Sequence, residues 1–138
     1  MSLRRLQARV PAARPLGAAV LAGHSLRFHK AGRDGSAKCD AFHTAELADA
    51  IHGVLFHIDA AGKSVLDRVE GLGAGYDEKR VTLACGTAAV TYVATHIDDG
   101  LLPFDWYKQH VLVGAREASL PVDYIATIDR HPAIADPD

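Results

Sequence analysis

The order of the expected elements predicts an α+β domain with a mostly antiparallel, curled sheet. Strand-like alternation comes early in the chain, helical spacing comes late, and strands and helices do not alternate regularly. The strands are numerous for 138 residues, which favours a small β-barrel over an open sheet. No repeat, linker or low-complexity segment divides the sequence, so a single domain spanning residues 1–138 is expected.

The first half of the chain contains a short helix followed by candidate strands. Leu3, Leu6 and Val10 share one side of a helix predicted over residues 2–9, and Pro11 ends it because the residue before a proline disfavours helix. Apolar runs and alternating patterns predict strands over residues 18–22, 24–30, 38–44 and 51–58. The last of these strands is almost continuously apolar, so we expect it to be buried on both faces.

The second half is predicted to hold a hairpin and two helices. Alternating residues indicate two strands over residues 79–85 and 88–96, joined by a turn. Helical spacing returns over residues 104–118. Pro121 suits the first position of a last helix, where its missing N–H costs nothing. The residues expected on the inner side of that helix are Val122, Ile125 and Ile128.

The composition is that of an ordinary soluble globular protein, with 49% hydrophobic and 23% charged residues. A formal net charge of -2 gives no electrostatic reason to expect nucleic acid or a membrane surface as a partner. No apolar run approaches the roughly twenty residues of a membrane span. Cys39 and Cys85 have no CxxC spacing, and we expect both to be reduced, buried and inert in a cytoplasmic protein.

Residues 66–76 form the most informative stretch, in which a short helix ends at Glu70 and glycines follow. Asp59 can cap the start of this helix, and Gly71 can supply the left-handed residue at its end. Glu70 then lies in the last turn, where the helix dipole disfavours an anion and an apolar stripe would partly bury it. Both effects raise the pKa of a carboxyl group, which suits a general acid–base. An exposed helix end followed by a flexible glycine turn is the alternative interpretation.

Other kinds of site find little support. His52 and His57 are five residues apart on a predicted strand and face opposite sides, and no metal-binding motif occurs, so no metal and no cofactor are expected. The serines lack a Gly-x-Ser-x-Gly frame, and the glycines after Glu70 do not follow a strand as a dinucleotide-binding loop requires. Three tyrosines from three elements remain beside Glu70. Taken alone, each fits a core residue whose hydroxyl has found a hydrogen bond. They are Tyr76, Tyr92 and Tyr107.

Several segments carry a resemblance when taken together and in order. They are residues 4–11, residues 17–23, Asp34-Gly35-Ser36, residues 52–56, the motif Leu66-Asp67-x-x-Glu70-Gly71 with Gly75-Tyr76, and residues 114–117 with 120–121. This pattern resembles the gamma-glutamylcyclotransferase-like family, which includes AIG2-like and butirosin-related acyl-transfer proteins. The resemblance implies a small mixed barrel flanked by helices. It also implies that Glu70 is the catalytic acid–base and that the three tyrosines surround the pocket.

The activity that the resemblance implies is the cyclisation of a gamma-glutamyl amine or amino acid to 5-oxoproline, with release of the free amine. The attacking α-amine is tethered to the carbonyl that it attacks, so proximity supplies much of the rate. The protein must add a base, donors for the developing oxyanion and an acid for the leaving amine. The expected partner is a small gamma-glutamyl substrate. The identity of the amine is left open, and so is the oligomeric state, with a homodimer among the options.

The sequence departs from the family at its beginning. The family opens with a strand ending in Tyr-Gly-Ser-Asn, whose backbone N–H groups bind the glutamyl end of the substrate, whereas this chain begins at Met1, where that motif would end. We expect either that the sequence starts at an internal methionine or that the protein lacks this strand, with Met1 at the substrate site. In the second case the alternative to an enzyme is a non-catalytic member that binds a small molecule or a protein partner.

Overall fold

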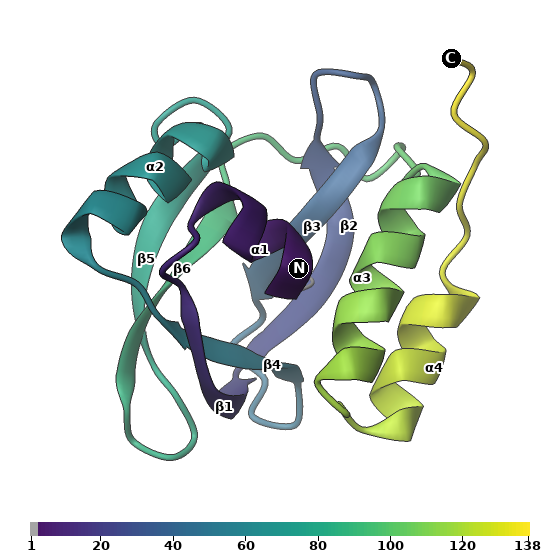
Figure 1. Cartoon of the computed structure of the whole chain (residues 1–138). Helices are drawn as coiled ribbons and strands as arrows, with labels where there is room; N and C mark the ends of the chain where they lie inside the picture. Colours follow the sequence, from purple (N-terminus) through teal and green to yellow (C-terminus); the bar gives the residue numbers. More distant parts are fainter. Residues whose placement is uncertain (1–2) are drawn as a thin grey trace.

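The computed structural model describes residues 3–138, and these contain six strands and four helices (Figure 1). In chain order they are α1 (Leu3–Arg9), β1 (Arg14–Ala22), β2 (His24–Ala31), β3 (Ala37–His43), β4 (Ala50–His57), α2 (Ala60–Glu70), β5 (Tyr76–Thr82), β6 (Ala88–Ala94), α3 (Asp105–Glu117) and α4 (Val122–Arg130). Most strands precede most helices, and the α+β class predicted from the sequence is confirmed.

The strands form three antiparallel pairs, β1 with β4, β2 with β3, and β5 with β6. Further hydrogen bonds connect the pairs. The N–H of Ala84 donates to the carbonyl oxygen of Val20 at 2.9 Å, and the N–H of Ala94 in β6 donates to the carboxylate of Asp40 in β3 at 2.7 Å. The pairs thus curl around a common interior (Figure 1), although the ladders of the described residues do not join into one closed barrel.

Two strands begin three or more residues earlier than the sequence predicts. β1 starts at Arg14 rather than at residue 18, because the register with β4 shifts between Pro15 and Gly17, and this irregularity accommodates a proline that cannot donate a ladder hydrogen bond. β5 starts at Tyr76 rather than at residue 79. Tyr76 is therefore a strand residue whose backbone is held by β6, and not part of the glycine turn.

Two clusters of buried side chains support the sheet from different sides. In the first, Leu6 and Val10 at α1 pack with Leu66 of α2. In the second, Phe28 of β2 packs with Leu112 of α3 and with a buried isoleucine of α4. Figure 1 shows α3 and α4 side by side at one edge of the sheet, with α1 and α2 over the other part. The helices are thus anchored on two separate cores.

Three expectations about burial are wrong. No residue of β4 is buried, because several of its side chains face a cavity instead of a packed core. Val122 is 81% exposed at the start of α4, so Ile125 and Ile128 alone of the three predicted residues pack inward. Cys85 is exposed in the turn after β5, whereas Cys39 is half-buried in β3, and both thiols are free.

Leu112→Ala is expected to lower the free energy of unfolding by about 2–5 kcal/mol, because truncating a fully buried leucine leaves a cavity in the second cluster. Val113→Ala is the matched control on the same helix, since Val113 is 48% exposed, and it should cost less than about 1 kcal/mol. Urea unfolding measures both values. Equal losses in the two variants would contradict the assignment of Leu112 to the core.

Candidate active site

Two cavities meet at the end of α2, and Glu70 and Tyr76 line both of them. The larger has a volume of about 580 Å³. We name it the tyrosine cavity because Tyr92 of β6 and Tyr107 of α3 line it together with Tyr76. All the tyrosines predicted to surround the pocket are therefore brought to the same space as Glu70.

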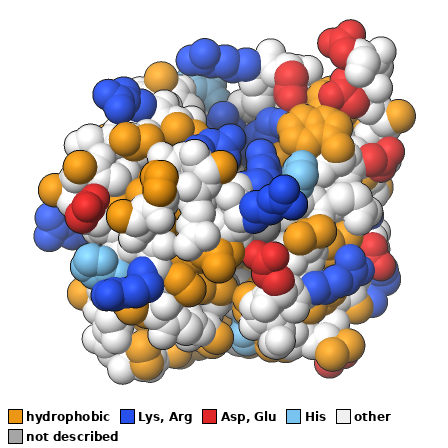
Figure 2. Space-filling model, viewed as in Figure 1, with side chains coloured by type: hydrophobic (Ala, Val, Ile, Leu, Met, Phe, Trp, Pro, Cys, Tyr) orange, Lys and Arg blue, Asp and Glu red, His pale blue; other side chains and the backbone are white. Residues whose placement is uncertain are grey.

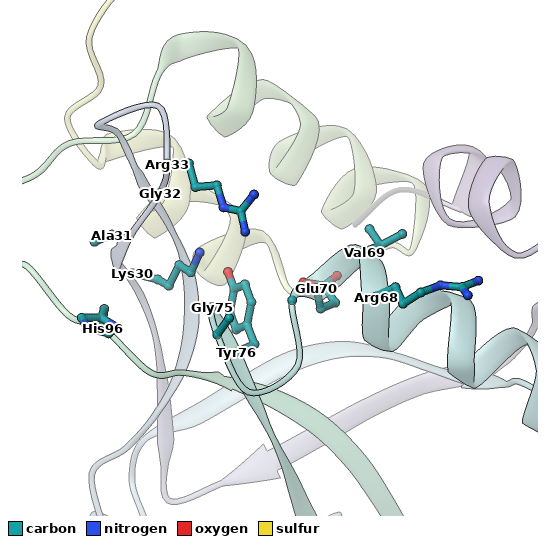
Figure 3. Close-up of a pocket in the computed structure, with 12 residues that line it drawn as sticks. Lys30, Ala31, Gly32, Arg33, Arg68, Val69, Glu70, Gly75, Tyr76 and His96 are labelled. Carbon is teal, nitrogen blue, oxygen red and sulfur yellow. The ribbon is translucent and has the colours of Figure 1, made fainter.

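The smaller cavity has a volume of about 470 Å³ and extends from Glu70 to the end of β2 and the loop after it. We name it the basic cavity because Lys30 and Arg33 line it. Figure 3 shows Glu70 and Tyr76 on one side of this space, with Lys30 and Arg33 opposite them. A molecule bound across the two cavities would pass the carboxyl group of Glu70.

Local sequence explains why Glu70 stands at this junction. The carboxylate of Asp59 caps the start of α2 by accepting from the N–H of Gly62 at 2.7 Å. Gly71 ends the helix in the left-handed conformation with φ of 68°. Both caps expected from the sequence are confirmed. Because Leu66 anchors the helix in the first cluster, the last helical residue is held at the cavity wall.

Burial raises the pKa of Glu70 above its ordinary value, while the positive charges of Arg9 and Lys30 act in the opposite direction. Burial is the larger effect, so the carboxyl group holds its proton more tightly than a free glutamate does. Within residues 3–138, no hydrogen bond or ion pair engages this carboxylate. A group in this state can accept a proton and return it, as a general acid–base must.

A second carboxyl group, that of Asp40, also lines the tyrosine cavity, but its oxygens are already in use. One accepts from the N–H of Ala94, and the other lies 2.6 Å from Nε2 of the buried His29. The other ring nitrogen of His29 lies 3.2 Å from Asp99. Asp40 therefore joins β2, β3 and β6, and Glu70 is the carboxyl group left available to a ligand.

The hydroxyl groups of Tyr76 and Tyr107 both form hydrogen bonds with the backbone of Cys39 in β3. Tyr76 donates to the carbonyl oxygen of Cys39 at 2.7 Å, and the N–H of Cys39 donates to the hydroxyl oxygen of Tyr107 at 2.9 Å. Burial raises the pKa of both phenols, so both stay protonated. Burial also raises the pKa of the Cys39 thiol to about 11, which makes it unsuitable as a nucleophile.

Tyr92 is held by Asp67, the aspartate of the Leu-Asp-x-x-Glu-Gly motif. The carboxylate of Asp67 accepts from the Tyr92 hydroxyl and from the Lys63 ammonium, and Lys63 also lies 2.7 Å from Glu78. Hydrogen bonds from Lys63 and Tyr92 lower the pKa of Asp67, whereas burial and the bond to Asp67 raise that of Tyr92 to about 12. This network ties α2 to β5 and β6 beside the site.

The structure thus brings Glu70 and the three tyrosines together, but it does not assign their roles. The hydroxyls of Tyr76 and Tyr92 donate to acceptors within the protein, as buried structural tyrosines also do. Contact of the tyrosines with a substrate stays a prediction. Met1, the remaining predicted substrate-binding residue, lies outside the described residues.

Sequence reasoning missed the positive charges around Glu70. Arg9, Lys30, Arg33 and Lys38 line the two cavities but come from separate elements. Figure 2 shows Lys and Arg side chains gathered around the hollow at the centre of one face. No local motif marks these residues, and the net charge of -2 conceals them, because only the fold brings them together.

The described part of the chain contains no cluster of three or more His, Cys, Asp or Glu side chains that could hold a metal ion. In the same residues, no helix has the length and apolar character needed to cross a membrane.

A sequence profile of the AIG2-like family matches residues 50–128, which is more than half of the chain. The protein therefore belongs to the AIG2-like family. The matched segment runs from β4 into α4 and includes Glu70 and the three tyrosines of the cavity. No curated protein sequence matches the chain significantly.

Solved structures share the fold at low sequence identity. A structure named gamma-glutamyl cyclotransferase has a TM-score of 0.83 and 21% identity, over 96% of this chain and 82% of that one. An uncharacterized protein from Homo sapiens has a TM-score of 0.80 and 22% identity, over 94% and 80%. YkqA from Bacillus subtilis has a TM-score of 0.69 and 21% identity, over 87% and 46%. Identities this low establish the fold alone.

Glu70→Gln is expected to stabilise the protein at high pH, and the gain should vanish as the pH falls. The folded protein holds the Glu70 proton more tightly than the unfolded chain does, so the ionised carboxylate costs stability above the folded-state pKa. That cost is absent below the ordinary pKa of 4.5. Urea unfolding of both proteins at about pH 8 and about pH 4 measures the difference.

Glu46→Gln is the control for this experiment, because it removes one negative charge from an exposed residue between β3 and β4. A Glu70→Gln protein no more stable than wild type at the higher pH would contradict the raised pKa of Glu70.

Proposed function

We propose that this protein is an enzyme that cyclises gamma-glutamyl amides to 5-oxoproline and a free amine, with Glu70 transferring the proton. The observation that carries the proposal is the position of Glu70. Its carboxyl group is half-buried, has a raised pKa and stands between two cavities large enough for a small molecule. Membership of the AIG2-like family and the structural similarity to a gamma-glutamyl cyclotransferase support the same reaction.

In this reaction the α-amine of the substrate attacks its own γ-carbonyl carbon. A new C–N bond closes the five-membered lactam, and the original amide C–N bond breaks. Glu70 takes the proton that the attacking nitrogen loses and gives a proton to the departing nitrogen, so no water or cofactor is consumed. Because attacking and attacked groups belong to one molecule, positioning by the cavity walls is the main contribution asked of the protein besides proton transfer.

The tyrosine cavity is the space that we assign to the glutamyl part of the substrate. Arg9 lines it and offers a positive charge to the α-carboxylate. Hydrogen bonds to the backbone of Cys39 hold Tyr76 and Tyr107 against β3, so these two side chains would form fixed walls of the cavity. Asp67 would position Tyr92. The departing amine would then lie past Glu70, in the basic cavity.

Glu70→Gln should reduce the rate of 5-oxoproline formation by at least about 100-fold, because the amide cannot transfer the proton. Chromatographic measurement of 5-oxoproline released from gamma-glutamylglycine gives the rate. Glu46→Gln, which changes an exposed residue outside both cavities, is the matched control and should keep the wild-type rate. An unchanged rate in Glu70→Gln would contradict the assignment of Glu70 as the group that transfers the proton.

A further inference from the structure

Two positive charges in the basic cavity face Glu70, and the described residues provide neither of them with an ion-pair partner. Figure 3 shows the side chains of Lys30 and Arg33 reaching into the space in front of Tyr76 and Glu70, whereas Arg68 extends away from it. Within residues 3–138, no carboxylate lies within ion-pair distance of either Lys30 or Arg33. Both side chains are therefore available to an anion from outside.

Asp34 holds the loop that carries Arg33 through hydrogen bonds, but it does not pair with the Arg33 guanidinium. Asp34 accepts from the N–H of Ser36 at 3.0 Å and from its hydroxyl at 2.6 Å, and the Lys38 ammonium lies 3.0 Å away. Although burial alone would raise the pKa of Asp34, these bonds lower it to about 2. The carboxylate next to Arg33 in sequence is thus committed to Ser36 and Lys38, which leaves the guanidinium without it.

Lys30 is held against the wall that contains Glu70. Its ammonium lies 4.8 Å from the centre of the Tyr76 ring. A Cβ atom on Gly75 would come within 3.2 Å of Nζ and within 3.4 Å of the carbonyl oxygen of Glu70, so the absence of a side chain there lets Lys30 approach the turn after α2. Burial lowers the pKa of Lys30 while the charge of Glu70 opposes it. An anion bound in this space would offset the free-energy cost of burying the Lys30 ammonium.

The chemistry of the departing amine matches this arrangement. When an amino acid leaves from a gamma-glutamyl amide, its carboxylate is attached to the carbon next to the departing nitrogen. A nitrogen placed to receive the proton of Glu70 therefore carries its carboxylate into the neighbouring space, where Lys30 and Arg33 lie. A polyamine or another cationic amine would bring a positive charge to the same place and be repelled.

We propose that the basic cavity binds the carboxylate of the departing amine through Lys30 and Arg33, so that the enzyme selects gamma-glutamyl amino acids over neutral or cationic gamma-glutamyl amines. This inference rests on the proposed function, because it places the reacting amide bond beside Glu70. It adds the class of substrate and the two residues that select it.

Three substrates of matched size test the selection, namely gamma-glutamylglycine, gamma-glutamylglycinamide and mono-gamma-glutamyl-ethylenediamine. Their departing amines carry a negative, a neutral and a positive group at the same position. Charge-assisted hydrogen bonds to the glycine carboxylate should raise kcat/KM by about 10-fold to 100-fold over the glycinamide substrate. The ethylenediamine substrate should be the poorest of the three.

Lys30→Gln and Arg33→Gln should each reduce the ratio of kcat/KM between the glycine and glycinamide substrates, and the double variant should bring it to about one. The ratio is measured because the charge of Lys30 also lowers the pKa of Glu70. Loss of Lys30 should therefore change kcat/KM for every substrate, and the ratio cancels this common effect. Lys30→Glu combined with Arg33→Glu should reverse the order and favour the cationic amine. Arg27→Gln is the matched control, since this exposed arginine lies on β2 but lines neither cavity, and it should keep the wild-type ratio.

Turnover of all three substrates by the wild type with a ratio near one, or with the cationic amine preferred, would overturn this inference and leave the proposed function standing. A ratio that the Lys30 and Arg33 variants do not change would overturn it as well.

A binding measurement separates the two proposals where no 5-oxoproline is formed. Calorimetric titration of Glu70→Gln protein with gamma-glutamylglycine and with gamma-glutamylglycinamide measures affinity without turnover. Tighter binding of the glycine compound by about 10-fold or more, lost in Lys30→Gln and Arg33→Gln backgrounds, would support the carboxylate site even if the proposed reaction failed. Equal affinity, or no binding of either compound, would overturn it.

Discussion

The environment of Glu70 depends on how α2 ends. Gly71 adopts a left-handed conformation that residues with a Cβ atom disfavour, and it turns the chain directly after Glu70. The glycine-rich turn then delivers Tyr76 to the first position of β5, on the wall that it shares with Glu70. Burial at this wall raises the pKa of the carboxyl group against the positive charges of Arg9 and Lys30. The candidate chemistry of the site follows from that balance.

The tyrosine cavity lies between two cores, and this explains its shape. Tyr92 packs against the first cluster and Tyr107 against the second, so neither core fills the space between them. The apolar residues of β4, such as Val54 and Phe56, face this space and are only half-buried as a result. An apolar wall with a few fixed polar groups is typical of sites for small molecules.

The positive charges that line the two cavities are concentrated in one place, although the total charge of the chain is slightly negative. The chain as a whole carries a formal charge of -2, but the side chains that line the cavities bring several positive charges to one hollow (Figure 2). Lys38 is compensated by Asp34 and by the ring of Tyr107, at 4.6 Å from its centre. Lys30 and Arg33 have no such carboxylate within ion-pair distance among the described residues.

The sequence by itself determined the features that depend on neighbouring residues. The caps at Asp59 and Gly71, the hairpin of β5 and β6 and the helical spacing of α3 were all predictable, because capping, turns and periodicity are local properties. Only the tertiary structure decided the half-burial of β4, the exposure of Val122 and the meeting of Lys30 and Arg33 with Glu70. These features depend on contacts between segments far apart in the chain, and no local pattern records which segments will meet.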